Sequence, residues 1–233
     1  MDEKPSMVTI GVAIGSPARA AMLDALVAGH ALTATELARV ARVAPATAST
    51  HLEKLLRSGL LSRERHGRHR YFRIAGPEVA EALEVLGRLG AERAAPKPPT
   101  SREQKAIHRA RLCYDHFAGE LGVAMTSAMV DNGWLVPEDR DFQLTEAGET
   151  FFAELGIDLD AARSKRRMFA RQCLDWSERR PHLAGSLGAA LAERAFDEGW
   201  VKRTRQPREV EITRHGETVL ERHFGFSHPF SSS

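Results

Sequence analysis

Residues 16–74 carry a succession of helix and turn signals that admits few folds. Ser16-Pro17 predicts the start of a helix, because serine is a favoured N-cap and proline suits the first helical position. Thr33 and Glu36 form a capping-box pattern that opens a second helix. Val43-Ala44-Pro45 predicts the turn that ends it, so a third helix follows closely.

The third helix is expected over residues 46–58, before Gly59. A basic hairpin over residues 60–74 follows, with its tip near His66-Gly67. Three helices and a hairpin form a winged helix-turn-helix, which lays one helix in a DNA groove and the hairpin, or wing, beside it. We therefore predict a DNA-binding domain over residues 1–93, with a further helix at Met7–Ile14 and a last helix over 77–93.

Positive charge is concentrated on this same segment. Residues 16–75 contain ten lysines and arginines against four acids, a balance of +6, whereas the whole chain carries only +2. A basic face on such a fold is the electrostatic footprint of phosphate binding. The alternative is a solvated basic hairpin on an unrelated three-helix domain, but the spacing of the helices ahead of the hairpin favours DNA.

The third helix separates into a core face and a solvent face. Ala48, Leu52 and Leu55 recur at helical spacing and should face the core. Small hydroxyl residues near the helix start suit close approach to base edges, and long basic side chains suit phosphates. The candidate DNA-contacting residues are Thr47, Ser49, Thr50, His51, Lys54 and Arg57 on the helix and Arg65, Arg68 and Arg70 on the wing.

Two linked motifs carry a family resemblance. Ser49-x-His51-Leu52-x-x-Leu55-x-x-x-Gly59-Leu60, followed by Arg65-x-Gly67-Arg68-x-Arg70-Tyr71-Phe72, resembles the ArsR-type (arsenical-resistance repressor-like) winged helix over about residues 7–93. The resemblance implies a homodimer that binds operator DNA and usually represses. It also implies dimerisation through the flanking helices, where Val79, Leu83 and Leu86 form one apolar face. A helix packed only on its own domain is the alternative.

The metal sites of this family are missing from the first domain. Metal-sensing members carry Cys-x-Cys beside the second helix, where this chain has Thr33-Ala34-Thr35, or Asp and His ligands on the last helix. Residues 77–93 include no histidine or cysteine. Soft and borderline metals need thiolate or imidazole ligands, so we do not expect metal sensing by this domain.

A duplication organises the rest of the chain. After a proline-rich linker over residues 94–101, residues 102–233 contain two repeats, at about 102–157 and 158–226. Each repeat is expected to be winged-helix-like, in the order helix, helix, hairpin, helix, which makes the whole protein mainly α with small β wings. This domain loosely resembles the C-terminal extensions of some longer ArsR-like regulators. The motifs that recur from the first repeat to the second are Ala110-Arg111-x-Cys113-x-Asp115 with Ala170-Arg171-x-Cys173-x-Asp175, Asp131-x-Gly133-Trp134 with Asp197-x-Gly199-Trp200, and Thr145-x-x-Gly148 with Thr213-x-x-Gly216.

The two cysteines occupy matching positions in the repeats and form a candidate sensor with His116. Cys113 and His116 are expected on one face of a helix, and Trp176 stands where the second repeat should carry a histidine. If the repeats pack about a two-fold axis, the thiols of Cys113 and Cys173 lie close together. They would then bind a soft metal, undergo modification or form a regulatory disulfide. The alternative is that both thiols simply fill the core.

Other residues admit functional and structural interpretations. The i, i+4 pairs Arg111–Asp115 and Arg171–Asp175 are expected to support their helices. Residues 163–171 form a basic run, either an extra phosphate contact or a solvated helix face, and we favour the solvated face. The aromatic residues of the repeats either line an effector pocket or form core, and core is the more common role. They are Trp134, Phe142, Phe151, Phe152 and Trp200.

The sequence therefore favours a transcriptional regulator, released from DNA by an unknown signal that the C-terminal domain senses. An architectural DNA-binding protein without effector and a Cys-dependent enzyme using Cys113, Asp115 and His116 are the alternatives. An enzyme is disfavoured because a nucleophile and base usually converge from separate elements. No signal peptide and no apolar run of about 20 residues is present, so we expect a cytoplasmic protein without a membrane partner.

Overall fold

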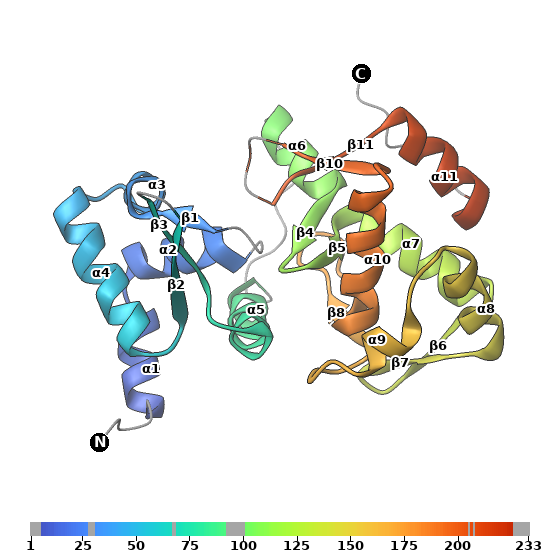
Figure 1. Ribbon diagram of the computed structural model, residues 1–233, viewed down its shortest axis with the longest axis horizontal. Coiled ribbons are helices and arrows are strands. Elements are labelled where there is room, and N and C mark those ends of the chain that lie inside the picture. The colour runs from blue at the N-terminus through green and yellow to red at the C-terminus, as the bar shows by residue number, and fades with distance from the viewer. Residues whose placement is uncertain are drawn as a thin grey trace. The chain divides into compact units, whose positions relative to one another are not determined.

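The computed structural model describes residues 6–27, 31–66, 69–91, 101–204, 206 and 208–225. The chain divides into two compact units, residues 1–87 and 88–233 (Figure 1). The linker expected over residues 94–101 lies, except for Ser101, outside the described residues.

The first unit is the winged helix-turn-helix predicted from the sequence. A third strand, which the sequence pattern did not predict, joins the hairpin, so that the sheet has the order β1-β3-β2. The elements are α1 (Met7–Ile14), α2 (Pro17–Val27), β1 (Leu32–Thr33), α3 (Ala34–Val40), α4 (Pro45–Arg57), β2 (Leu61–His66), β3 (His69–Ile74) and α5 (Pro77–Ala91).

Local signals fix the helices of this unit. Thr33 caps α3 as a capping box, since its hydroxyl accepts from the amide of Glu36 and the Glu36 carboxylate accepts from the amide of Thr33 at 2.7 Å. Ala48, Leu52 and Leu55 of α4 are buried, as their spacing predicted. They share the core with α2, α3 and the wing, which fixes how α4 lies on the unit.

No single helix among the described residues is long and apolar enough to cross a membrane. Helices α1 and α2 pass that test only together, and the pair is bent by 94°.

The second unit begins with α6 (Arg102–Arg109), whose capping box at Ser101 and Gln104 is confirmed. Two copies of hairpin, helix, hairpin and helix follow. The first copy comprises β4 (Arg111–Cys113), β5 (His116–Ala118), α7 (Gly119–Asp131), β6 (Leu135–Glu138), β7 (Asp141–Leu144) and α8 (Glu146–Glu154). After α9 (Leu159–Arg163), the second copy comprises β8 (Arg171–Leu174), β9 (Pro181–Ala184), α10 (Gly185–Asp197), β10 (Val201–Arg203), β11 (Val210–Ile212) and α11 (Arg214–Phe224).

The expected order of helix, helix, hairpin and helix lacks one element in each repeat. The cysteine motif, predicted on a helix, forms a β-hairpin between the first helix, α6 or α9, and the second, α7 or α10. In the first repeat α6 ends at Arg109 and Ala110 is already extended. Tyr114 turns the first hairpin with a φ of 58°. The strands have only three or four residues, and their edges are completed by the other repeat, which no local sequence signal reveals.

The two repeats exchange strand pairing. Asp141 of the first copy pairs with Arg171 of the second, which joins β6-β7-β8-β9 into one sheet. The matching bridge joins Arg111 to Glu209 beside β11, and the amide of Leu112 donates to the carbonyl of Arg208 at 2.8 Å. The two bridges relate equivalent residues, so the repeats interlock about an approximate two-fold axis.

The aromatic residues of the repeats form core. Trp134 stacks on Phe151 with ring centroids 3.6 Å apart, and Phe142, Phe152 and Trp200 are buried in the same cluster. The hydroxyls of Thr145 and Thr213 donate to the glycine carbonyl that precedes each tryptophan, both at 2.7 Å. These contacts anchor the second hairpin of each repeat to its last helix.

Gly216 provides a test of this packing. A Cβ there would lie 1.9 Å from the carbonyl oxygen of Trp200, so Gly216→Ala must move backbone. We expect a loss of about 1–3 kcal/mol in the free energy of unfolding. All three tryptophans lie in the second unit, so urea unfolding followed by tryptophan fluorescence reports on it. Gly87→Ala, in open space on α5, is the control and should leave this transition unchanged.

Candidate functional site

Helix α4 presents an exposed polar face on the first unit. Thr47, Ser49, Thr50, Lys54 and Arg57 are exposed, on the side opposite the buried leucines. Two of the hydroxyls are held in place, because Ser49 donates to the carbonyl of Pro45 and Thr50 donates to that of Ala46. Each hydroxyl oxygen keeps acceptor capacity toward a ligand.

His51 is less exposed than its position on the predicted solvent face of the helix suggests. It is half-buried, and Arg19 donates from Nη1 to its Nδ1 at 3.2 Å. Burial, together with the charges of Arg19 and Lys54, lowers the pKa of His51. Since a guanidinium only donates, Nδ1 is the acceptor and the neutral ring carries its proton on Nε2. Arg19 also donates to the carbonyl of Val12, which ties α1 to α4 through this histidine.

The wing adds arginines beside α4. Arg65 and Arg70 are exposed and lie opposite each other in the β2–β3 register. Arg73 pairs with Glu64 at 3.1 Å, so the single acid of the wing is matched. Arg68 lies outside the described residues. The described arginines therefore extend the polar face of α4 with positive charge.

Two helices of the first unit carry exposed apolar side chains. On α5, Val79 and Leu83 are half-buried and Leu86 is 47% exposed. On α1, Met7 and Val12 are 87% and 66% exposed. Both surfaces lie on the flanking helices through which the family resemblance implies dimerisation.

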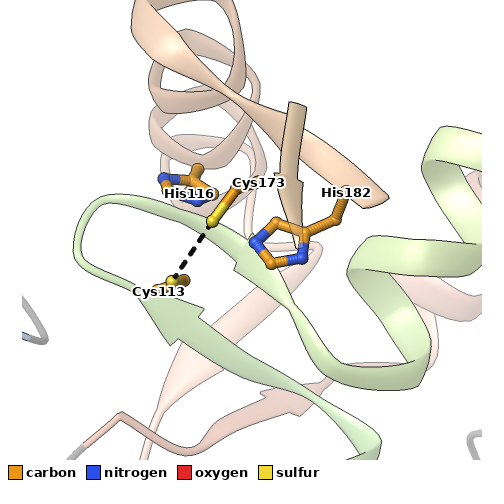
Figure 2. Close-up of side chains that lie close together, drawn as sticks. All are labelled: Cys113, His116, Cys173 and His182. Carbon is orange, nitrogen blue, oxygen red and sulfur yellow. Dashed lines mark hydrogen bonds between the residues drawn. The ribbon is translucent and has the colours of Figure 1, made fainter. Parts of the chain in front are cut away.

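A second candidate site lies in the second unit, where the two cysteine hairpins meet. Cys113 pairs with His116 across β4 and β5, and Cys173 pairs with His182 across β8 and β9. The two sulfur atoms are 4.0 Å apart, and one ligand atom from each of the four residues lies within 4.8 Å of the others. Figure 2 shows the rings of His116 and His182 on either side of the Cys173 sulfur. All four residues are at most 7% exposed.

Comparison with known proteins identifies the class. A family model described as "Helix-turn-helix domain" matches residues 14–64. The chain is 42% identical over 219 residues to the uncharacterized HTH-type transcriptional regulator YdfF of Bacillus subtilis (strain 168), covering 94% of this chain and 97% of that relative. The chain belongs to the HTH-type transcriptional regulators.

Solved structures are similar to the first unit of the regulator. The homodimeric winged helix-turn-helix DNA-binding domain of a possible ArsR-family regulator from Mycobacterium bovis is 29% identical, with a TM-score of 0.35. The match covers 36% of this chain and 78% of that domain. HlyU from Vibrio cholerae, in reduced form, is 24% identical with a TM-score of 0.32, covering 35% of this chain and 85% of that one.

The structure corrects the placement expected for the candidate sensor residues. Cys113 and His116 share a hairpin rather than a helix face, and the second repeat does carry a histidine, His182. Trp176 is not its equivalent, since its ring lies against the guanidinium of Arg111 at 4.3 Å. The signal was present in the sequence. The offset of 66 that relates Gly119 to Gly185 also relates His116 to His182.

Each histidine of the cluster faces a carboxylate. His116 Nδ1 lies 3.4 Å from Asp115, and His182 Nδ1 lies 3.3 Å from Asp175, without hydrogen-bond geometry in the second case. Burial alone would raise the pKa of both carboxyls. For Asp175, the contacts with His182 and Arg111 outweigh burial and hold the pKa far below its usual range. For Asp115, the contacts with His116 and Arg167 lower the pKa in the same way.

The expected i, i+4 pair of Arg111 with Asp115 is wrong. Arg111 instead donates to Asp175 of the other repeat at 2.7 Å, and both side chains are essentially fully buried. Arg167 pairs with Asp115 and also donates to the carbonyl of Gly185 at 2.6 Å. The basic run is therefore not wholly a solvated face, because Arg167 is largely buried in its pair with Asp115 of the other repeat.

Breaking the buried Arg111–Asp175 pair should strongly destabilise the second unit. Arg111→Met leaves the Asp175 carboxylate buried without its guanidinium, and we expect a loss of about 3–5 kcal/mol in the free energy of unfolding. The matched control is Arg163→Met, which breaks a half-exposed pair with Glu149 and should cost at most about 1 kcal/mol. Urea unfolding followed by tryptophan fluorescence measures both. Equal losses would contradict the role of Arg111.

Proposed function

We propose that the chain is a homodimeric repressor that binds operator DNA and is released when its second unit senses a signal. The observation that carries the proposal is the exposed face of α4, with its small hydroxyl residues, beside an arginine-rich wing. A helix-turn-helix protein places such a helix in the major groove, and its dimer reads two half-sites about one helical turn apart.

The residues of this face divide by the contact that each would make. Thr47, Ser49 and Thr50 lie in the first turns of α4, where short side chains let the helix approach base edges closely. Lys54 and Arg57 lie further along and would contact phosphates, together with Arg65, Arg68 and Arg70 of the wing. His51 would donate from Nε2, because Arg19 occupies its Nδ1.

Lys54→Ala tests the phosphate role. Since a phosphate contact carries no sequence information, we expect weaker binding to every DNA, with the slope of log K against log salt reduced by about one. Fluorescence anisotropy on the upstream region of the regulator's own gene and on random DNA, over a series of salt concentrations, measures this. A loss confined to one sequence would contradict the assignment.

Thr47→Ala and Thr50→Ala test base reading. We expect both variants to bind random DNA about as well as the parent but to rank single-base operator variants differently, because specificity depends on contacts to base edges. Selection from a randomised half-site measures the ranking. An unchanged ranking would remove these residues from the reading face. Equal affinity of the parent for random DNA and for its own upstream region would favour the architectural alternative.

The exposed apolar residues of α1 and α5 support a dimer through these helices. Leu86→Glu places a charge in the proposed interface, so we expect a monomer in light scattering. Losing the second half-site should lower operator affinity by about a hundredfold. Val136→Glu is the control, because Val136 of β6 has a similar exposure of 43% in the other unit. A Leu86→Glu dimer with parental affinity would move the interface elsewhere.

The second unit is the candidate for signal sensing. It places two buried thiols and two imidazoles where its repeats meet, so a ligand bound there touches both halves of the fold. A change in that ligand would alter the packing of one repeat against the other, which is the kind of two-state element that regulation needs.

A further inference from the structure

The cysteine–histidine cluster brings together four donors that suit a borderline metal. Cys113 and Cys173 supply sulfur, and His116 and His182 supply ring nitrogen. Two sulfur and two nitrogen donors in a closed set are typical of tetrahedral zinc sites. No backbone change is needed to collect them, because each hairpin already presents its own Cys–His pair across two strands.

The distances fit such a site. Two sulfurs each about 2.3 Å from a tetrahedral ion lie about 3.8 Å apart, and the two sulfurs here are 4.0 Å apart. The four ligand atoms lie within 4.8 Å of one another. Small side-chain rotations therefore suffice to bring all four atoms into coordination.

The surroundings of the histidines fit as well. Metal-bound histidines usually present their other nitrogen to a carboxylate, which fixes the ring and raises its basicity. Here Asp115 lies at Nδ1 of His116 and Asp175 at Nδ1 of His182. That arrangement leaves Nε2 as the ligand atom. Nε2 of His182 is buried, and it neither donates to nor accepts from any of the described residues.

Charge is also balanced in this buried position. Two thiolates neutralise a divalent ion, and the imidazoles are neutral. The two carboxylates outside them, Asp115 and Asp175, are each paired with an arginine, Arg167 and Arg111. A divalent ion in this environment leaves no net charge uncompensated, which keeps the free-energy cost of burying it low.

We propose that Cys113, His116, Cys173 and His182 bind one zinc ion tetrahedrally, two ligands from each repeat, and that the ion joins the repeats. Binding forms two Zn–S and two Zn–N bonds and releases the two thiol protons to solvent. The site is distinct from the metal positions of the winged helix, which lack ligands here. A regulatory role for the ion rests on the proposed function above, but zinc binding itself does not.

Titration of the reduced full-length chain with Co²⁺, without DNA, tests the proposal. Cobalt replaces zinc in tetrahedral sites and gives a thiolate-to-metal absorption band. We expect one ion per chain, complete displacement by Zn²⁺, and protection of both thiols from alkylation by bound zinc. Because no DNA is present, this result is independent of whether the operator experiments succeed.

Matched variants identify the ligands. Cys173→Ser and His182→Gln should lose the band or weaken zinc affinity at least tenfold, whereas His215→Gln, an exposed histidine of α11, should bind as the parent does. Asp115→Asn should weaken affinity by about 10–100-fold while keeping the stoichiometry, since Asp115 positions a ligand rather than binding the ion.

Three results would overturn the proposal. The first is a reduced parent chain without the thiolate band. The second is a His182→Gln chain that binds cobalt as the parent does. The third is a parental chain whose midpoint of thermal unfolding, followed by tryptophan fluorescence, is unchanged by zinc, since a ligand of the folded state must raise it. This measurement needs no variant, so it decides the question even where circular dichroism shows that a variant does not fold.

Discussion

The exchange of strand pairing between the two repeats is the constraint on which the second unit depends. Hairpins β4–β5 and β8–β9 are only three or four residues per strand, and each pairs with the second hairpin of the other repeat. An isolated repeat would therefore leave strand edges and backbone groups unpaired. The same exchange brings Cys113 and Cys173 together and places Arg111 against Asp175.

Buried polar residues reinforce this arrangement. The carboxylate of Asp175 accepts from Arg111 and from the amide of Gly119, so one side chain of the second repeat holds both a strand and a helix start of the first. Arg167 makes the reciprocal connection, because it donates to the carboxylate of Asp115 in the first repeat and to the carbonyl of Gly185 in the second. An ion pair of this kind adds little stability where solvent reaches it. A buried charge that loses its partner is costly, so these pairs disfavour any other arrangement of the two repeats.

The division into two units separates two kinds of chemistry. The first unit places exposed hydroxyls and arginines on α4 and the wing, a surface suited to a polyanion. The second unit places thiols and imidazoles in its interior, where only a small ligand reaches. Any ligand bound at the junction of the repeats would touch the contacts that hold the second unit together.

The sequence by itself determined the winged helix-turn-helix, because caps, turns and the buried face of Ala48, Leu52 and Leu55 act within a few residues of one another. It also showed the duplication, since matching motifs need no knowledge of contacts. The equivalence of His182 to His116 could be read from the offset of 66 between the repeats, but the hairpins around the cysteines and the partner of Arg111 were decided only by the tertiary structure. The strands of these hairpins are too short to have a local preference. The contacts between the repeats join residues far apart in the sequence, Asp141 with Arg171 and Arg111 with Asp175, whose proximity arises only when the two repeats fold onto each other.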